Sequence, residues 1–387
     1  MNTKLKNFLL ICRSELLHIM KDQGVVLFVF LVPLLYPLLY AYIYNNETVS
    51  EVPVAVIDRQ GSALSRQFTR MIDATSEVKL VASCMSVAEA ERLNKRGEIY
   101  AFVVIPEDFD KTLARGDQAV IGVYADMAGM LYYKSALLAA TNASLAMNKQ
   151  IKAERLYLGA TSRQEEIATQ PIAFDHVEMY NPQGGFASFL MPAVMMLILQ
   201  QTMLLGMGMI GGGIRERFGG SSLAPEMRNF NPMMIVLGKT AVFFVIYIVL
   251  ALYMFTVVTD IFGLPSLGNV FTFLALMVPY ILGCCFMSIT CSAFIYRRED
   301  CILLFVFMSV PLLFLSGISW PGAAIPTFWK WFSYIFPSTF AVNGYVHINS
   351  MGASLGQVST EFYALWGQTL VYFLTAIIFY RKALKKQ

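Results

Sequence analysis

Uncharged, apolar runs recur along the chain and are separated by short charged segments. A helix needs about 20 apolar residues to cross a hydrocarbon layer about 30 Å thick, and six runs approach or exceed that length. They are Gly24–Tyr44, Phe186–Ile210, Thr240–Thr259, Val270–Tyr296, Cys301–Ile318 and Phe362–Tyr380. The pattern predicts an α-helical polytopic membrane protein with six transmembrane helices. Residues 1–44 are expected to hold a short amphipathic segment and the first span, retained as an anchor, and residues 186–387 the other five spans.

Residues 45–185 follow a different pattern, in which short runs rich in Val, Ile and aromatic residues alternate with amphipathic stretches. Strands are predicted at 52–58, 77–83, 99–106, 119–126 and 171–180, and helices at 63–73, 88–95, 107–116 and 129–158. Ser62 can cap the first helix, Ser86 with Glu89 forms a capping box for the second, and Ser162 with Glu165 marks a further start. This alternation predicts a small α/β domain with an at least partly parallel sheet, inserted between the first two spans.

Residues 315–340, "LSGISWPGAAIPTFWKWFSYIFPSTF", are too rich in proline for one spanning helix and too apolar for an ordinary loop. Irregular backbone survives at membrane depth only where protein or a water-filled cavity satisfies it. A re-entrant helical hairpin is therefore expected at 319–340. Trp320, Pro321, Pro326 and Trp329 are candidates for an outer gate, and Lys330 is expected to reach the lipid headgroups.

Composition and charge agree with a membrane protein and add an orientation. Hydrophobic residues make up 57% and charged residues 14% of the chain, against about 45–50% and 25% in soluble domains. With both termini in the cytoplasm, fourteen Lys and Arg residues around the spans lie inside and only Lys330 lies in the short outer loops. The domain at 45–185 is then extracytoplasmic. The net charge of +3 reports this topology and gives no indication of nucleic-acid binding.

Two glutamines and a tyrosine are candidates for a translocation path. Gln200 and Gln201 lie in the middle of the second predicted span, where an unpaired amide facing lipid is costly. Hydrogen bonding between helices and lining of a pore both remain open, with hydrogen bonding favoured. Tyr36 lies deeper in the first span than Tyr40 and Tyr44, which suit an interfacial aromatic belt.

The stretch "GGGIRERFGG" (211–220) ends the longest apolar run with Arg215, Glu216, Arg217 and Phe218. A short helix carrying these residues could form charge-assisted hydrogen bonds with a partner, with Phe218 as an apolar anchor. The alternative is a basic anchor that merely ends the span, although topology gains little from Glu216. The glycines fit close helix packing or a flexible joint.

The sequence carries no pattern of its own for catalysis, metal binding or nucleotide binding. A Gly-x-x-x-x-Gly-Lys-Ser/Thr phosphate loop is missing, and so is the cysteine spacing of zinc sites. His176 has no nucleophile pattern near it and reads as a strand residue. Cys84 is the only cysteine in the predicted outer domain, which therefore cannot close an internal disulfide. We expect no catalytic residue and no cofactor on this chain.

The whole chain resembles the long, drug-efflux-like form of the ABC-2 type exporter permeases. Three stretches carry the resemblance, in order: "AVIDRQGSALSRQFTRMID" (55–73), "GEIYAFVVIPEDFDKTLARGDQAVIGVYAD" (97–126) and "IRERFGGSSLAPEMRNFNPMMIVLGKT" (214–240). The last departs from the family's Arg-Glu-Arg-Glu-x-Gly-Thr pattern at Phe218 and Gly219–Ser221.

The resemblance implies a permease in the bacterial inner membrane that acts with a second copy or a sister permease. It implies that an ABC ATPase, which binds ATP and Mg²⁺, docks on the cytoplasmic coupling loop at 211–239 and drives outward export of an amphipathic or lipophilic substrate. Whether the outer domain meets a periplasmic adaptor is left open. An ion-driven carrier is a weak rival, because the spans hold no central ionisable residue. A membrane-anchored sensor or assembly platform, whose outer domain binds a ligand or partner, is the main alternative.

Overall fold

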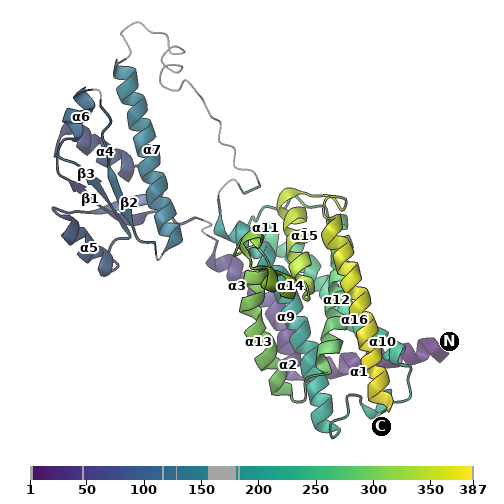
Figure 1. Cartoon of the computed structure of the whole chain (residues 1–387). Coiled ribbons are helices and arrows are strands. Elements are labelled where there is room, and N and C mark those ends of the chain that lie inside the picture. Colours follow the sequence, from purple (N-terminus) through teal and green to yellow (C-terminus); the bar gives the residue numbers. More distant parts are fainter. Residues whose placement is uncertain are drawn as a thin grey trace. The chain divides into compact units, whose positions relative to one another are not determined.

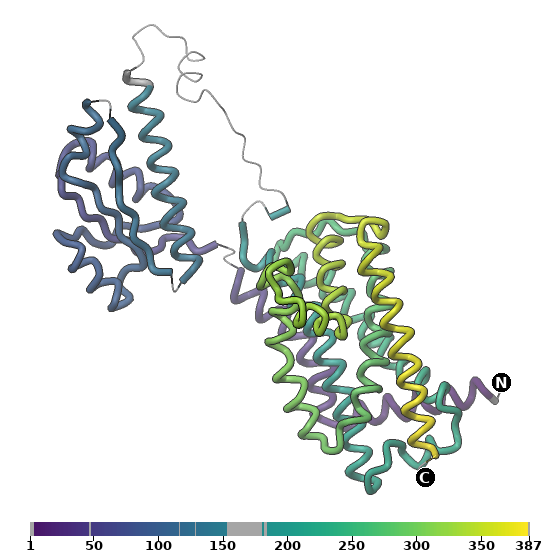
Figure 2. Tube along the Cα trace, in the orientation of Figure 1, coloured from purple at the N-terminus to yellow at the C-terminus, as the bar shows by residue number. Residues whose placement is uncertain are grey.

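The computed structural model describes residues 3–45, 48–115, 117–127, 129–155, 180–181 and 184–385. The chain divides into two compact units, one of Met1–Glu47 with Glu178–Gln387 and one of Thr48–Val177. We call them the helical unit and the α/β unit (Figures 1 and 2). Residues 171–179 of the predicted strand at 171–180, the helix start at Ser162 with Glu165, and His176 lie outside the described residues.

The α/β unit contains a four-stranded sheet in the order β2-β1-β3-β4. Strand β1 pairs in parallel with β2 and β3, and β4 pairs antiparallel with β3, which confirms the partly parallel sheet. The elements are β1 (Val52–Asp58), α4 (Ala63–Asp73), β2 (Val78–Ser83), α5 (Val87–Lys95), β3 (Ala101–Ile105), α6 (Phe109–Arg115), β4 (Gly122–Ala125) and α7 (Met130–Arg155). Each of the four described strands overlaps a predicted one.

Alternation along β1 sends side chains to two separate cores. Val54 packs in a cluster with residues of α4 and α7, whereas Ile57 packs in a second cluster with residues of α5. Both predicted serine caps are present: Ser62 Oγ accepts from Ser65 N at 3.0 Å, and Ser86 Oγ accepts from Glu89 N at 3.3 Å. The sheet is thus covered on both faces, as expected of parallel strands joined by helices.

The helical unit is built from long helices that run back and forth, with shorter helices between them (Figure 1). Its elements are α1 (Thr3–Lys21), α2 (Gln23–Val26), a π-helical turn (Leu27–Leu31), α3 (Val32–Ile43), α9 (Phe186–Arg217), α10 (Pro232–Tyr253), a second π-helical turn (Met254–Val258), α11 (Thr259–Ile261), α12 (Val270–Ser292), α13 (Arg298–Leu315), α14 (Thr327–Ser333), α15 (Pro337–Met351) and α16 (Ser359–Lys385). Helices α1 and α16 lead to the chain ends at the same end of this unit, where α9 also ends.

Five stretches among the described residues are long and apolar enough to cross a membrane. They are Gln23–Ile43, Phe186–Arg217, Pro232–Ile261, Val270–Ser292 and Ser359–Lys385. The predicted span at 301–318 corresponds to α13, which is not among them. Its 18 residues begin with Arg298, Glu299 and Asp300, so its apolar part is short. The six-span count therefore stays a prediction.

Helix α9 occupies the centre of the helical unit and contacts α3, α12, α13 and α15. It is apolar on all sides, as a helix surrounded by other helices must be. Helix α15 also packs against α12 and α16 and was not predicted as an element; the expected hairpin at 319–340 includes only its first turn. Pro337, which the sequence pattern predicts to interrupt a spanning helix, is the first residue of α15, a position where proline is well tolerated.

Candidate functional site: an apolar cavity and the end of α9

A cavity of about 460 Å³ lies between α3, α9 and α13. Its volume is in the range of small-molecule sites. Apolar and aromatic side chains form most of its wall, and none of the lining residues is charged. The lining residues are Phe28, Val32, Tyr36, Tyr40, Tyr44, Leu190, Val194, Leu197, Ile198, Gln201, Thr202, Leu205, Phe305, Val306, Ser309, Val310 and Leu313. Such a wall suits a neutral, largely apolar molecule.

The tyrosines at every fourth position of α3 share one face of the helix and line this cavity together. Tyr36 meets Tyr40 edge to face at a centroid distance of 6.0 Å, and Tyr44 meets Phe186 of α9 at 5.1 Å. Tyr36 is 45% exposed, and Val306 and Val310 on α13 are 48% and 59% exposed. The cavity therefore opens at the side of the helical unit, between α3 and α13.

Gln201 is the unusual residue of the cavity wall. Its side chain is only 8% exposed, yet neither its amide nitrogen nor its amide oxygen has a hydrogen-bond partner among the described residues. The neighbouring Thr202 is satisfied, because its hydroxyl donates to Ile198 O at 2.7 Å and accepts from Tyr247 OH at 3.0 Å. A buried amide without a partner is costly, so Gln201 is the cavity-lining residue whose hydrogen-bonding groups the described residues leave unused.

Gln200 points elsewhere, because adjacent helical residues face different directions. Its Nε2 donates to Ser338 Oγ at 3.0 Å, and its Oε1 accepts from Ser338 N at 2.8 Å. Ser338 belongs to the first turn of α15, whose N–H groups have no partner within their own helix. Gln200 thus caps α15 from α9. Of the three path candidates, Gln201 and Tyr36 meet in the cavity, and Gln200 is a link between helices.

The residues Arg215, Glu216 and Arg217 form the last turn of α9 and not a separate short helix, so the expectation of an independent helix here is wrong. The 32-residue helix continues through the glycines because its neighbours pack against them. A Cβ at Gly208 would collide with Cys301 Sγ, and one at Gly212 would lie 2.9 Å from the backbone nitrogen of Arg298. Close packing is therefore the role of Gly208 and Gly212, whereas Gly213 has open space around it.

Arg215 is turned into the protein and is 6% exposed. It donates to Ser222 Oγ from Nε at 3.1 Å, to Ala293 O from Nη2 at 3.0 Å, and to Ile295 O from Nη1. Its guanidinium also lies over the rings of Tyr296 and Phe379. Arg215 therefore links the ends of α9 and α12. Its guanidinium is buried and is not accessible to a partner at the surface.

Glu216 also makes a contact within the chain, although it is exposed. Its Oε1 accepts from Arg298 N at 3.0 Å, at the start of α13, and the Arg298 guanidinium pairs with the carboxylate of Asp22. Asp22 in turn accepts from Gly24 N and Val25 N and so caps α2. This network joins the starts of α2 and α13 to the end of α9. Arg298, at the start of α13, is a central member of this network.

Arg217 and Phe218 remain exposed at the end of α9. The helix stops there because Gly219 and Gly220 adopt positive φ values of 62° and 89°, which favour glycine. Gly220 N then donates to Arg215 O at 2.8 Å and reverses the chain. Of the predicted loop 211–239, only residues 218–231 lie between α9 and α10.

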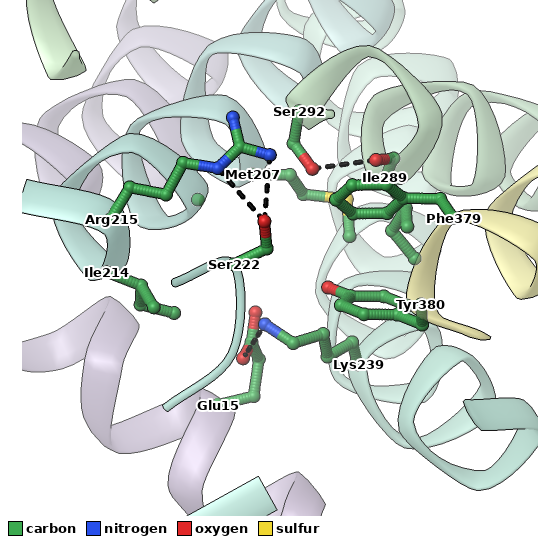
Figure 3. A pocket seen from close by; sticks show the side chains of 11 residues that line it. Glu15, Met207, Ile214, Arg215, Ser222, Lys239, Ile289, Ser292, Phe379 and Tyr380 are labelled. Carbon is green, nitrogen blue, oxygen red and sulfur yellow. Dashed lines mark hydrogen bonds and ion pairs between the residues drawn. The ribbon is translucent and has the colours of Figure 1, made fainter. Parts of the chain in front are cut away.

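A buried ion pair beneath this turn was not predicted as a site. Lys239 Nζ lies 2.8 Å from Glu15 Oε2, and their side chains are 6% and 1% exposed. Figure 3 shows the pair in a small pocket with Arg215, Ser222 and Tyr380. The pair holds α1 against α10. The sequence does show Lys239 beside an apolar span, but it counted there only as one of the basic residues that set the orientation in the membrane.

Two backbone carbonyl groups in the segment of the expected hairpin accept hydrogen bonds from side chains of neighbouring helices. Thr339 Oγ1 donates to Ser333 O at 2.6 Å, and Gln368 Nε2 of α16 donates to Tyr334 O at 2.6 Å. The gate candidates Trp320, Pro321, Pro326 and Trp329 are all exposed, and none of them lines the cavity.

The described residues thus define a mostly helical, multi-pass membrane protein with an apolar cavity in its helical unit. The family model for ABC-2 family transporter protein matches residues 24–378. The chain therefore belongs to the ABC-2 transporter family and has a role in membrane transport. Members are transmembrane, generally non-catalytic subunits, and the family in general implies an ATPase partner. No curated protein matches the chain at a significant level.

Proposed function

We propose that this chain is the permease subunit of an ATP-driven exporter that moves an amphipathic or lipophilic substrate outward from the cytoplasm or the inner leaflet. The cavity beside Gln201 carries the proposal. It is apolar, uncharged and open to the side between α3 and α13, where a molecule dissolved in the bilayer could enter. The NH₂ group and the carbonyl oxygen of the Gln201 amide, which have no partner among the described residues, orient such a molecule by hydrogen bonding.

The fuel comes from a separate ABC ATPase that holds ATP and Mg²⁺, and this chain needs no cofactor of its own. The proposed docking surface is the segment of Arg217, Phe218 and the loop to residue 231, which we call the coupling segment. Phe218 is 39% exposed, and an aromatic side chain beside an arginine is typical of interface hot spots. Glu216 and Arg215 connect this segment to α12 and α13, so a push on it is transmitted to both helices.

The proposed setting is the bacterial inner membrane, with both termini and the coupling segment in the cytoplasm and the α/β unit outside. The permease works with a second copy or a sister permease, as the ABC-2 family resemblance suggests, and the α/β unit is the natural contact for a periplasmic adaptor. The exposed tryptophans of the hairpin are then in the outer interface with lipid headgroups.

Co-purification tests the proposal. The tagged full chain is purified from its native membrane, ATP hydrolysis is measured, and bound chains are identified by mass spectrometry. An ATPase with a phosphate loop is expected with the wild type and is expected to be lost with Phe218→Asp. Phe271→Asp is the matched control, because Phe271 is 81% exposed at the start of α12, on the far end of the helical unit.

Two results would contradict the proposal. An ATPase that stays bound to the Phe218→Asp variant would show that the coupling segment is not part of the interface. Transport of a lipophilic dye by vesicles that contain this chain alone would remove the need for an ATPase. Failure of any ATPase to co-purify with the wild type would favour the sensor or assembly platform.

A further inference from the structure

Helix α1 presents three different faces. Ile11, Glu15 and Ile19 are buried, and Glu15 pairs with Lys239 of α10. A second face is apolar but uncovered, and its members are Leu5, Leu9, Leu16 and Met20, each between 45% and 58% exposed. A helix with one face on the protein and an open leucine face, next to the spans of a membrane protein, belongs at the membrane surface with its leucines in the bilayer boundary.

The third face of α1 forms one wall of a groove with a volume of about 320 Å³. The other wall comes from Arg217 at the end of α9 and from Glu226 in the segment between α9 and α10. The residues from α1 are Leu10, Arg13, Ser14, Leu17, His18 and Lys21. The groove therefore brings a membrane-surface helix and the coupling segment together.

The charges of this groove are unbalanced. Arg13, Lys21 and Arg217 face Glu226, and among the described residues no ion pair to any of the three cations is formed. Glu226 accepts a long hydrogen bond of 3.4 Å from Ser14 Oγ. His18 Nδ1 is buried without a partner in the described part of the chain. The groove thus offers two arginine forks and an ammonium group to an anion.

We propose that this groove binds the headgroup of an anionic phospholipid. Arginine forks match the geometry of phosphate oxygens, and basic pockets beside transmembrane helices at the membrane surface suit lipid phosphates. Leu10 and Leu17 lie in the same groove. They contribute contacts to the start of an acyl chain that a free phosphate ion or a protein carboxylate would not use. The bound lipid bridges α1 to Arg217 and so makes the coupling segment sensitive to membrane composition.

Lipid retention by the purified full chain tests this inference. The chain is placed in nanodiscs of phosphatidylcholine with phosphatidylglycerol as the minor lipid, and retained phosphatidylglycerol is measured by native mass spectrometry. The double variant Arg13→Gln with Lys21→Gln should bind phosphatidylglycerol about 30-fold more weakly, as expected for two charges near a membrane surface. Glu226→Gln removes the opposing carboxylate and should bind it several-fold more tightly, a gain that misfolding would not produce.

A matched control separates the groove from general attraction to an anionic membrane. Lys382→Gln with Lys385→Gln removes the same charge from exposed positions in the last turn of α16, at the same end of the helical unit. This variant should retain phosphatidylglycerol as the wild type does. An equal loss in both double variants would overturn the inference.

Two further arms identify other occupants. Displacement of phosphatidylglycerol by inorganic phosphate at low concentration would show a site for soluble anions and overturn the lipid assignment. If the Arg13→Gln and Lys21→Gln variant keeps its lipid but loses the co-purifying ATPase, the groove is a protein-docking site. The lipid measurement needs no ATPase, so its failure would leave the proposed export function standing.

Discussion

Gln200 and Gln201 carry the same side chain at adjacent positions of α9 and differ only in what surrounds them. Gln200 exchanges two hydrogen bonds with Ser338, while the amide of Gln201 has no partner among the described residues. Methionine has nearly the volume of glutamine and no amide, so Gln200→Met and Gln201→Met remove the same polar group from two environments. We expect the two substitutions to change stability in opposite directions.

The structure supplies the sizes of the two effects. Gln200→Met leaves the N–H of Ser338 at the start of α15 without an acceptor, in a residue that is 1% exposed, and should lower the free energy of unfolding by about 1–3 kcal/mol. Hydrogen bonds between membrane helices average about 0.6 kcal/mol, so two of them already account for the lower bound. Gln201→Met removes an unsatisfied buried amide and should raise the free energy of unfolding by about 1 kcal/mol.

The assay is reversible unfolding of the purified chain in mixed micelles by increasing amounts of a denaturing detergent, followed by circular dichroism. The two variants are predicted to differ by about 2–4 kcal/mol in the free energy of unfolding. A second readout uses a lipophilic ligand with an amide group, which should stabilise the wild type and the Gln200→Met variant more than Gln201→Met. That comparison links the orphan amide to ligand binding.

Loss of stability in Gln201→Met as large as in Gln200→Met would refute the reasoning. It would mean that the Gln201 amide has a permanent protein partner in the membrane and is not reserved for a ligand. Equal stabilisation of all three proteins by the amide ligand would place its binding site outside the cavity.

Three further predictions concern other parts of the chain. Glu15→Leu and Lys239→Met should each lower the free energy of unfolding by about 3–5 kcal/mol and expose α1 to trypsin, because each leaves a lone charge buried. The double variant has an apolar pair instead and should return to within about 1 kcal/mol of the wild type. A similar loss of stability in all three variants would contradict this. Gly212→Ala should destabilise by about 1–3 kcal/mol, because its Cβ would meet backbone atoms 2.9 Å away, while Gly213→Ala, with open space around it, should be nearly neutral in the same unfolding assay. Burial raises the pKa of the Cys84 thiol, so iodoacetamide should alkylate it slowly until the pH exceeds the usual thiol range of about 8.5, and the contribution of this thiol to the stability of the α/β unit should be lost as the pH rises above that range; fast alkylation near pH 8 would show an exposed thiol.

The sequence by itself determined the class of protein and the order of its parts. The length of each apolar run is a local property, and it located the five described helices that are long and apolar enough to cross a membrane, because a bilayer sets a minimum length for such a helix. Caps are also local, so Ser62 and Ser86 were identified correctly in the α/β unit. The ABC-2 family followed from three ordered stretches and is confirmed by the match over residues 24–378.

Only the tertiary structure decided which polar side chains have hydrogen-bond partners among the described residues and which do not. Gln200 and Gln201 are indistinguishable in sequence, and the rotation of α9 alone turns one to Ser338 and the other to the cavity. Arg215 looked like a surface residue, yet its partners Ala293 and Ile295 lie about 80 positions away in the chain. Partners at such separations depend on how whole helices pack, and no pattern of nearby residues contains that information.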